Sequence, residues 1–368
     1  MKILHIIIAL PSGGAERFVV DLANEQSKSY DVTLLTLKND EGPNGFYLNE
    51  VGNRVKYINL GIKGKLGIKT IPKLYSNIRN IKPDVVHFHL QAVLILAFPY
   101  ILLNNRTLYV QTLHNDAKRC INAHGVLLAY LEKLAYKLSL VKLVTISKEN
   151  DASFKKECGF DSANLIYNGR NKPSCHQPDT VANEIKKYKI NNETVIIAHI
   201  GRYHPQKNQR LLITSFNRVI KEGANSILLI IGDGYDSEEG LILKNMAGDN
   251  IFFMGRQRYV ADYLLNSDAF VLSSLYEGMP IALIEAFACG CLPLSTPVSG
   301  CMDLIQDGIN GFISTDFSED SFIVMLNRFF KNHKKIDRNM LRQYYENELT
   351  IERCADKYIN MYKKYLHS

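Results

Sequence analysis

The sequence predicts an α/β protein made of two doubly wound domains in tandem, with a cleft between them. Short apolar runs alternate with helical patterns along the chain, and this alternation indicates parallel sheets covered by helices on both faces. A polar stretch with two prolines, residues 168–192, interrupts the pattern, which then restarts. The length of 368 residues also fits two domains, at about 150 residues per domain.

The first half of the chain supplies six strand candidates, each a short run rich in apolar residues. They are Ile3–Leu10, Val32–Leu37, Val55–Leu60, Val85–Phe88, Leu108–Thr112 and Leu143–Ile146. Helical spacing predicts helices over Ala15–Lys28 and Ile68–Ile81. The longest apolar run, Ala92–Leu103, contains Pro99. We expect it to be a buried helix, because a membrane span needs about 20 residues.

The second half repeats the pattern and ends in a helix. Strands are expected at Val195–Ile200, Ser226–Ile231, Ile251–Met254, Ala269–Ser273 and Leu292–Ser295, and a helix at Arg210–Lys221. Apolar residues recur at helical spacing after Thr350, which can cap the helix start. The predicted organisation is a domain over 1–168, a linker over 169–192, a domain over 193–349 and a C-terminal helix over 350–368.

Composition excludes several classes of protein. Apolar residues make up 46% and charged residues 22%, which excludes a disordered or fibrous chain. Of the seven cysteines, only Cys289 and Cys291 lie close together, without zinc-site spacing. We therefore expect reduced thiols and no metal site.

His5 and Pro11 interrupt the apolar start, so no signal peptide is predicted and a cytoplasmic location is expected. The phosphate-binding P-loop and the hydrolase nucleophile motif do not occur in the sequence.

Two candidate site segments lie in the first domain. Gly13 and Gly14 follow the first strand and open a helix, where free amides and close backbone approach favour an anion such as phosphate. A bare tight turn explains these glycines equally well. His114 follows a strand at its carboxyl end, so it can face the cleft or be structural. His87 and His89 are interpreted as packed core residues.

The second domain carries cations and carboxylates after its strands. Gly201, Arg202 and Lys207 follow its first strand, at the end where open α/β sheets bind ligands, and two cations there suit a diphosphate. Glu277 precedes a helix that contains Glu285 among apolar residues. Such carboxylates suit vicinal hydroxyls of a ribose or a sugar, and the amides at the helix start can meet phosphate. Solvated surface charges are the alternative.

Taken together, these segments resemble the retaining glycosyltransferases of family 4, which have the GT-B fold of two Rossmann-like domains facing across a cleft. The resemblance covers nearly the whole chain. Its motifs, in order, are Gly13-Gly14-Ala15-Glu16, Asn168-Gly169, Gly201-Arg202 with Lys207-Asn208, Gly232-Asp233-Gly234, Phe253-Met254-Gly255, the E-x7-E pair Glu277 and Glu285, Ala288–Pro293 and Asp307–Gly311. One departure is Tyr167 and Arg170, where the family usually has Pro and Val or Ile.

The resemblance implies a role for each matching position. Arg202 and Lys207 would bind the donor diphosphate, Glu285 the ribose, and Glu277 the donor sugar. Backbone contacts to the donor are implied for Gly278, Met279, Pro280 and Ile281. The base would lie near Met254, Gly255 and Arg256, the distal phosphate or acceptor near Gly13 and Gly14, and the donor sugar near His114. The implied cosubstrate is a nucleotide-sugar, with UDP as the default, and no metal is expected.

The acceptor is expected to contact the first domain, where positive charge gathers. Residues 62–82 contain six bases and no acid, with apolar residues interleaved. This pattern favours docking on an anionic membrane surface and a lipid-linked saccharide acceptor; a solvated helix face is the alternative. Nucleic acid is not an expected partner, because the stretch lacks an aromatic stacking array. A sugar-nucleotide 2-epimerase and a nonenzymatic sugar-nucleotide sensor remain alternatives, although the E-x7-E segment favours transfer.

Overall fold

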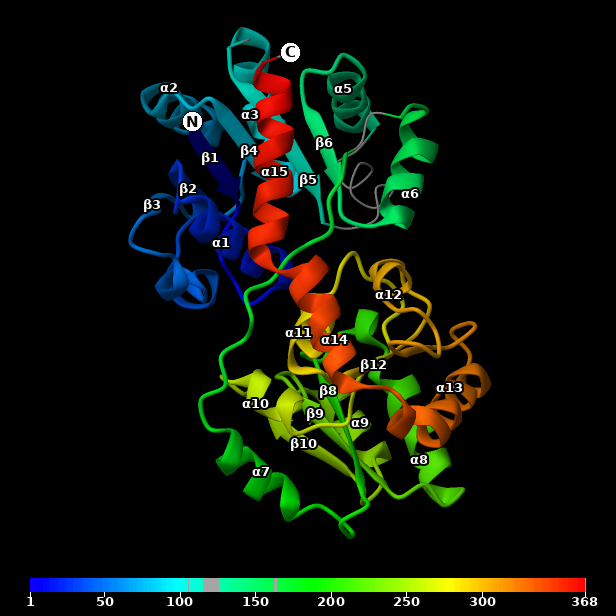
Figure 1. Ribbon diagram of the computed structural model, residues 1–368. Helices are drawn as coiled ribbons and strands as arrows, with labels where there is room; N and C mark the ends of the chain where they lie inside the picture. The colour runs from blue at the N-terminus through cyan, green and yellow to red at the C-terminus, as the bar shows by residue number, and fades with distance from the viewer. Residues whose placement is uncertain (105, 115–125, 162–163, 368) are drawn as a thin grey trace. The chain divides into compact units, whose positions relative to one another are not determined.

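The structure is a computed structural model that describes residues 1–104, 106–114, 126–161 and 164–367. It divides into two compact units, residues 1–171 with 350–368 and residues 172–349 (Figure 1). Each unit is built on one parallel sheet. The predicted α/β class with two doubly wound domains is confirmed.

The first unit contains a seven-stranded sheet in the order β3-β2-β1-β4-β5-β6-β7. Its strands are β1 (Lys2–Ile7), β2 (Asp31–Lys38), β3 (Lys56–Ile62), β4 (Val85–His89), β5 (Leu108–Leu113), β6 (Lys142–Thr145) and β7 (Asn164–Leu165). The strand order reverses at β1, which pairs with β2 on one side and β4 on the other. Such a reversal places residues from β1, β4 and β5 side by side at one sheet edge.

Helices cover this sheet on both faces. They are α1 (Gly14–Gln26), α2 (Ile71–Ile81), α3 (Gln91–Leu103), α5 (Val126–Lys137), α6 (Lys148–Cys158) and α15 (Ile351–Leu366). The apolar run that includes Pro99 forms α3, as predicted. Among the described residues, every helix is too short or too polar to cross a bilayer.

The C-terminal helix α15 belongs to the first unit and packs against α1 and β5, as the red helix of Figure 1 shows. Its apolar stripe is buried, with Tyr358 and Tyr362 fully inside. Thr350 caps the helix by accepting a hydrogen bond from the Arg353 amide. Gly169 lies against the helix start, where an added Cβ would come within 2.4 Å of the Thr350 carbonyl oxygen.

The second unit contains a six-stranded sheet in the order β10-β9-β8-β11-β12-β13. The strands are β8 (Val195–Ile200), β9 (Ser226–Ile231), β10 (Ile251–Gly255), β11 (Ala269–Leu272), β12 (Leu292–Ser295) and β13 (Phe312–Ile313). Around it lie α7 (Pro178–Lys186), α8 (Gln209–Lys221), α9 (Glu238–Met246), α10 (Val260–Leu265), α11 (Ile281–Cys289), α12 (Ser299–Leu304), α13 (Glu319–Asn332) and α14 (Arg338–Tyr344).

The segment expected to be a linker contains helix α7. Residues from 172 onward belong to the second unit, and Val181 and Ile185 of α7 pack in the core with Ile196 and Ile227. These two apolar residues stand four positions apart in an otherwise polar stretch, which is enough for one buried helix stripe. The polar composition of the stretch concealed this pattern.

Candidate active site

In the second unit, close backbone packing brings the carboxyl ends of β8 and β9 together. The Gly201 amide donates to the Ile231 carbonyl over 2.9 Å. Gly232 has a φ of +152°, and an added Cβ would lie 2.2 Å from the Gly201 carbonyl oxygen. Only glycine fits there, which explains the first glycine of the Gly232-Asp233-Gly234 motif.

A short turn after β8, residues Pro205–Lys207, is fixed to the segment that follows β11. The Gln206 side-chain amide donates to the Tyr276 carbonyl over 2.7 Å, and the Leu275 amide donates to the Gln206 carbonyl over 2.8 Å. The Ser273 hydroxyl donates to the Lys207 carbonyl over 2.8 Å. These bonds hold the backbone of Lys207 beside the loop that carries Glu277.

Lys207 and Glu277 form an ion pair at this edge of the sheet. The distance from Lys207 Nζ to Glu277 Oε1 is 2.7 Å, and the Ser274 hydroxyl donates to the same oxygen over 2.7 Å. The side chains are 22% and 10% exposed. Among the described residues, no bond reaches the other oxygen of Glu277, Oε2. The pair therefore presents a cation and a carboxylate oxygen that a diphosphate sugar could use.

The other predicted cations of this unit are exposed. Arg202 lies at the surface after β8, and within the part of the chain that the structure describes its guanidinium has no hydrogen-bond or ion-pair partner. Arg256, after β10, lies 3.5 Å from Asp233. Met254 is half-buried, and Gly255 has a φ of +64°. These residues lie at the carboxyl ends of β8 and β10, which flank β9 in the sheet, so the expected base and phosphate positions share one sheet edge.

The loop before α11 is buried and tightly packed. Gly278, Met279, Pro280 and Ile281 are buried, and Gly300 packs so closely below that an added Cβ would lie 2.1 Å from the Gly278 carbonyl oxygen. Pro280 is the residue immediately before α11, which begins at Ile281.

Glu285 lies within α11 and is 8% exposed. A carboxylate in so apolar a helix is costly unless it is hydrogen-bonded. Its burial is therefore consistent with a positioned ligand-binding group rather than a solvated surface charge.

In the first unit, the helix start at Gly13 and Gly14 is not bare. Gly13 precedes α1 in an extended conformation, and the carboxylate of Glu16 lies over it, 2.2 Å from where a Cβ would be. A carboxylate at a helix N-terminus interacts favourably with the free amides. A phosphate could reach these amides only after the flexible Glu16 side chain moves aside.

His114 follows β5 and is 8% exposed. Its Nε2 lies 3.2 Å from Nδ1 of His89, and its ring contacts the edge of Phe18. Burial lowers the pKa of His114 to about 4, so the ring is neutral at pH 7. A neutral imidazole at this position can exchange a hydrogen bond with a ligand but cannot supply positive charge.

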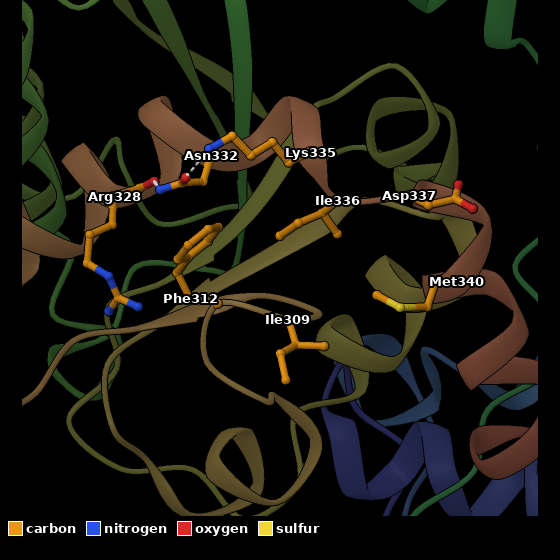
Figure 2. Close-up of a pocket in the computed structure, with 9 residues that line it drawn as sticks. Ile309, Phe312, Arg328, Asn332, Lys335, Ile336, Asp337 and Met340 are labelled. Carbon is orange, nitrogen blue, oxygen red and sulfur yellow. Dashed lines mark hydrogen bonds between the residues drawn. The ribbon is translucent and has the colours of Figure 1, made fainter.

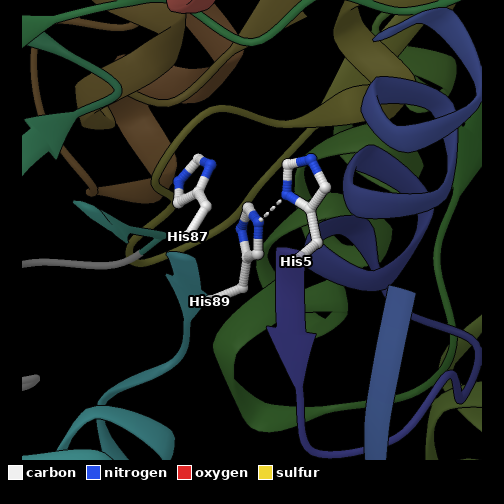
Figure 3. Close-up of side chains that lie close together, drawn as sticks. All are labelled: His5, His87 and His89. Carbon is white, nitrogen blue, oxygen red and sulfur yellow. Dashed lines mark hydrogen bonds between the residues drawn. The ribbon is translucent and has the colours of Figure 1, made fainter. Parts of the chain in front are cut away.

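Sequence spacing did not reveal a cluster of three fully buried histidines, His5 from β1 and His87 and His89 from β4 (Figure 3). Ligand atoms of the three lie within 4.8 Å of one another. The interpretation of His87 and His89 as packed residues agrees with their burial. The cluster could be found only from the pairing of β1 with β4, which brings distant parts of the sequence together.

A pocket of about 650 Å³ lies elsewhere in the second unit (Figure 2). Its lining includes Ile309, Phe312, Arg328 and Met340. None of the predicted site residues lines it, and we assign it no role in the candidate site.

A parallel α/β unit with cations and carboxylates at the carboxyl ends of its strands is suited to bind a ligand with phosphates and hydroxyls there, as a nucleotide-sugar has. Two family comparisons agree. Residues 12–172 match the family described as Glycosyltransferase Family 4, and residues 181–348 match Glycosyl transferases group 1. The chain belongs to these family 4, group 1 glycosyltransferases.

Individual relatives are distant. An Escherichia coli UDP-Gal:alpha-D-GlcNAc-diphosphoundecaprenol alpha-1,3-galactosyltransferase is 26% identical over 98% of this chain and 97% of its own length. An uncharacterized glycosyltransferase of Methanocaldococcus jannaschii is 31% identical, over 62% of this chain and 59% of that protein. Among solved structures, Anabaena HepE in complex with UDP has a TM-score of 0.81 at 17% identity, covering 99% and 100% of the two chains. This last likeness shows the GT-B fold.

Proposed function

We propose that the protein is a retaining glycosyltransferase that moves a sugar from a UDP-sugar to a saccharide or lipid-linked saccharide in cell-surface polysaccharide synthesis. The observation that carries this proposal is the Lys207–Glu277 pair held by Ser274 at the sheet edge of the second unit. Relatives named for a diphosphoundecaprenol acceptor and for Vi polysaccharide biosynthesis support the acceptor class.

In this proposal, fixed cations take the place of a metal. The bond between the sugar C1 and the diphosphate oxygen breaks through an oxocarbenium-like state while negative charge builds on the diphosphate. Lys207 and Arg202 stabilise that charge where it develops. Glu277 Oε2 accepts from a hydroxyl of the donor sugar, Glu285 binds the ribose, and neutral His114 hydrogen-bonds the sugar.

We propose that the anomeric configuration of the sugar is retained because the reaction follows a front-face path. The acceptor oxygen bonds to C1 on the face that the diphosphate leaves, and the departing phosphate oxygen takes the acceptor proton. No residue is assigned as a nucleophile.

A donor panel tests the class and the base. UDP-, GDP- and ADP-sugars are compared by thermal shift and by release of the nucleoside diphosphate, with UDP-sugars expected to respond. Glu285→Ala and Lys207→Ala should lose the response to the true donor, while Lys221→Ala, an exposed lysine of α8, serves as the matched control. Full activity in both site variants would reject the site assignment.

Product analysis separates the alternatives. A transferase leaves the sugar on an acceptor, a 2-epimerase returns an altered nucleotide-sugar, and a sensor leaves the nucleotide-sugar unchanged.

We further propose that residues 62–82 dock on an anionic membrane surface. Lys63, Lys65 and Lys69 are exposed, and Ile68 among them is 84% exposed. Exposed apolar and basic side chains together are what an anionic bilayer surface attracts. Lys73 is less available, since its ammonium group donates to the Leu60 carbonyl.

Liposome flotation tests this surface. Charge reversal of Lys65, Lys69 and Lys73 should abolish binding to anionic vesicles, and the same reversal of Lys186, Lys187 and Lys189 in the second unit should not. Unchanged binding of the first variant would reject the membrane surface.

A further inference from the structure

Strands β1 and β4 and helix α1 of the first unit place a series of hydrogen-bonded side chains behind His114, which follows β5. His5 Nε2 lies 2.8 Å from Gln26 Oε1, and His5 Nδ1 lies 3.0 Å from His89 Nε2. His89 Nδ1 lies 3.2 Å from His114 Nε2. Figure 3 shows the His5–His89 bond. His5, His89 and Gln26 are almost wholly inaccessible to solvent, so His114 forms the outer end of a buried chain.

The cluster of His5, His87 and His89 is better explained by these bonds than by a metal. All six ring nitrogens already have a protein partner, since His87 bonds Tyr362 through Nδ1 and Thr112 through Nε2. A metal ion needs a lone pair from each ligand, and binding one would break several of these bonds in a fully buried core. The hydrogen-bonded arrangement leaves no ring nitrogen of the three histidines unsatisfied.

The orientation of the Gln26 side chain, whose amide oxygen rather than its nitrogen faces His5, sets the direction of these hydrogen bonds. A carbonyl oxygen can only accept a hydrogen bond, so Nε2 of His5 carries the proton that Gln26 Oε1 receives. Nδ1 of a neutral His5 then accepts from His89 Nε2, and Nδ1 of a neutral His89 accepts from His114 Nε2. Burial lowers the pKa of His5 to about 4 and that of His89 well below its usual value, which keeps these rings neutral.

We propose that His5 and His89 are positioning residues that, anchored by Gln26, hold His114 as the single neutral tautomer with the proton on Nε2. Its Nδ1 then offers a lone pair, and in the described part of the chain no group occupies it. That lone pair suits a hydroxyl of the donor sugar as hydrogen-bond donor. The catalytic use of this arrangement rests on the proposed function, whereas the tautomer of His114 does not.

The tautomer can be measured in the free protein. In protein labelled with ¹⁵N-histidine, long-range ¹H–¹⁵N correlation should show His114 with its proton on Nε2. His89→Leu removes the acceptor and should give a mixture of tautomers, while His89→Asn should retain one, because Oδ1 of asparagine can replace Nδ1 of histidine. A matched control is His87→Leu, which removes an equally buried histidine outside the chain and should leave His114 unchanged.

A second variant changes the other end of the hydrogen-bonded series, at Gln26. Gln26→Met removes the anchoring carbonyl without touching any neighbour of His114, and it should also give a mixture of tautomers. The proposal is overturned if His114 keeps one tautomer in both His89→Leu and Gln26→Met, or if the folded wild-type protein carries the proton on Nδ1.

Kinetics test whether transfer uses the arrangement. His89→Leu should lower kcat about tenfold, the value of one lost hydrogen bond, with KM for the donor changed less than about threefold, and His89→Asn should recover most of the loss. In the background of His114→Ala, His89→Leu should cost nothing further. Should His114→Ala itself retain full activity, the proposed role of His114 in transfer fails while the tautomer measurement still decides the positioning role.

Discussion

The two units place their polar groups in opposite ways. The first unit contains 26 Lys and Arg against 16 Asp and Glu, a net charge of +10, while the second contains 18 against 21, a net charge of −3. Along β1 and β4, however, the basic unit collects neutral histidines, with His5, His87 and His89 fully buried. The second unit instead keeps charged groups at its strand ends, where Lys207 meets Glu277. Net charge therefore describes the surface of a unit, and the candidate chemistry follows the local arrangement.

A large loss of stability is expected from breaking a deeply buried ion pair of the first unit. Arg170 lies 2.7 Å from Asp21, with side chains 7% and 3% exposed. Arg170→Met removes the nearer of two cations beside the buried Asp21 carboxylate, because Arg17 Nε also lies 3.6 Å from Asp21 Oδ2. We therefore expect a loss of about 3 kcal/mol in unfolding free energy, the low end for breaking a buried pair. Denaturant unfolding of the full chain, with hydrogen exchange to assign the loss to the first unit, measures it.

The double variant Asp21→Asn with Arg170→Met provides the control. It removes both charges, and Asn171, which bonds Asp21 over 3.1 Å, can still donate to the new amide oxygen. Stability should return to within about 1 kcal/mol of the wild type. A single variant as stable as the double one would show that the pair contributes nothing.

Mild acid should weaken the first unit more than the second. Burial lowers the pKa values of His5, His114 and His199 to about 4, below the value of about 6.5 in an unfolded chain. The unfolded state therefore binds protons first as pH falls, and stability present above pH 6.5 is lost progressively down to about pH 4.

Between pH 7 and pH 5 each of these histidines costs about 2 kcal/mol. The first unit holds two of them together with His87 and His89, whose pKa values burial lowers well below the usual value. Burial also raises the pKa of its Glu132 to about 7, which returns about 2 kcal/mol over the same range because the folded state then binds the proton first. With four such histidines against one in the second unit, the first should still lose at least about 4 kcal/mol against about 2. Hydrogen exchange, corrected for its intrinsic pH dependence, resolves the two units. Replacing His199 by Gln should flatten the pH dependence of the second unit alone, and equal losses in both units would contradict the comparison.

Activity should depend most on the charged pair of the second unit. Lys207→Ala removes the cation from the proposed diphosphate position, and we expect kcat to fall by about a hundredfold, as for the loss of one group that stabilises developing charge. Release of the nucleoside diphosphate under saturating donor measures it. Lys207→Arg retains the charge and should lose less. A fall of less than threefold in the alanine variant would remove Lys207 from the mechanism.

The sequence predicted the elements better than their contacts. Strands such as Val195–Ile200 were predicted at their observed bounds because a buried parallel strand is a continuous apolar run. The two-residue strands β7 and β13 were missed, since so short a pairing leaves no periodic pattern. Lys207 and Glu277 were each predicted, but their direct pairing was not, because it depends on the turn after β8 meeting the segment after β11.

The departure from the family pattern at Arg170 shows the same limit. From the sequence Arg170 is only a departure from the usual family residue, and in the structure it is the partner of Asp21 on α1, 149 residues away. The Asn168-Gly169 motif had no assigned role, and Gly169 proves to allow the close approach of α15. In each case the residue type was visible, and the neighbour that gives it a function came only from the fold.

The smallest expected effect concerns how α15 is tied to the first unit. Thr350 accepts from the Arg353 amide at the helix start, and Thr350→Ala should cost about 1 kcal/mol, the usual value of a lost cap. Thr350→Ser keeps the hydroxyl and should cost less, which separates the cap from the loss of a methyl group. If the loss appears as faster exchange of α15 amides alone, the helix opens locally; if it lowers the stability of β1 and β5 as well, α15 is an integral part of the first unit. Because Tyr358 and Tyr362 of α15 bond Thr112 and His87 in the interior, we expect the second result.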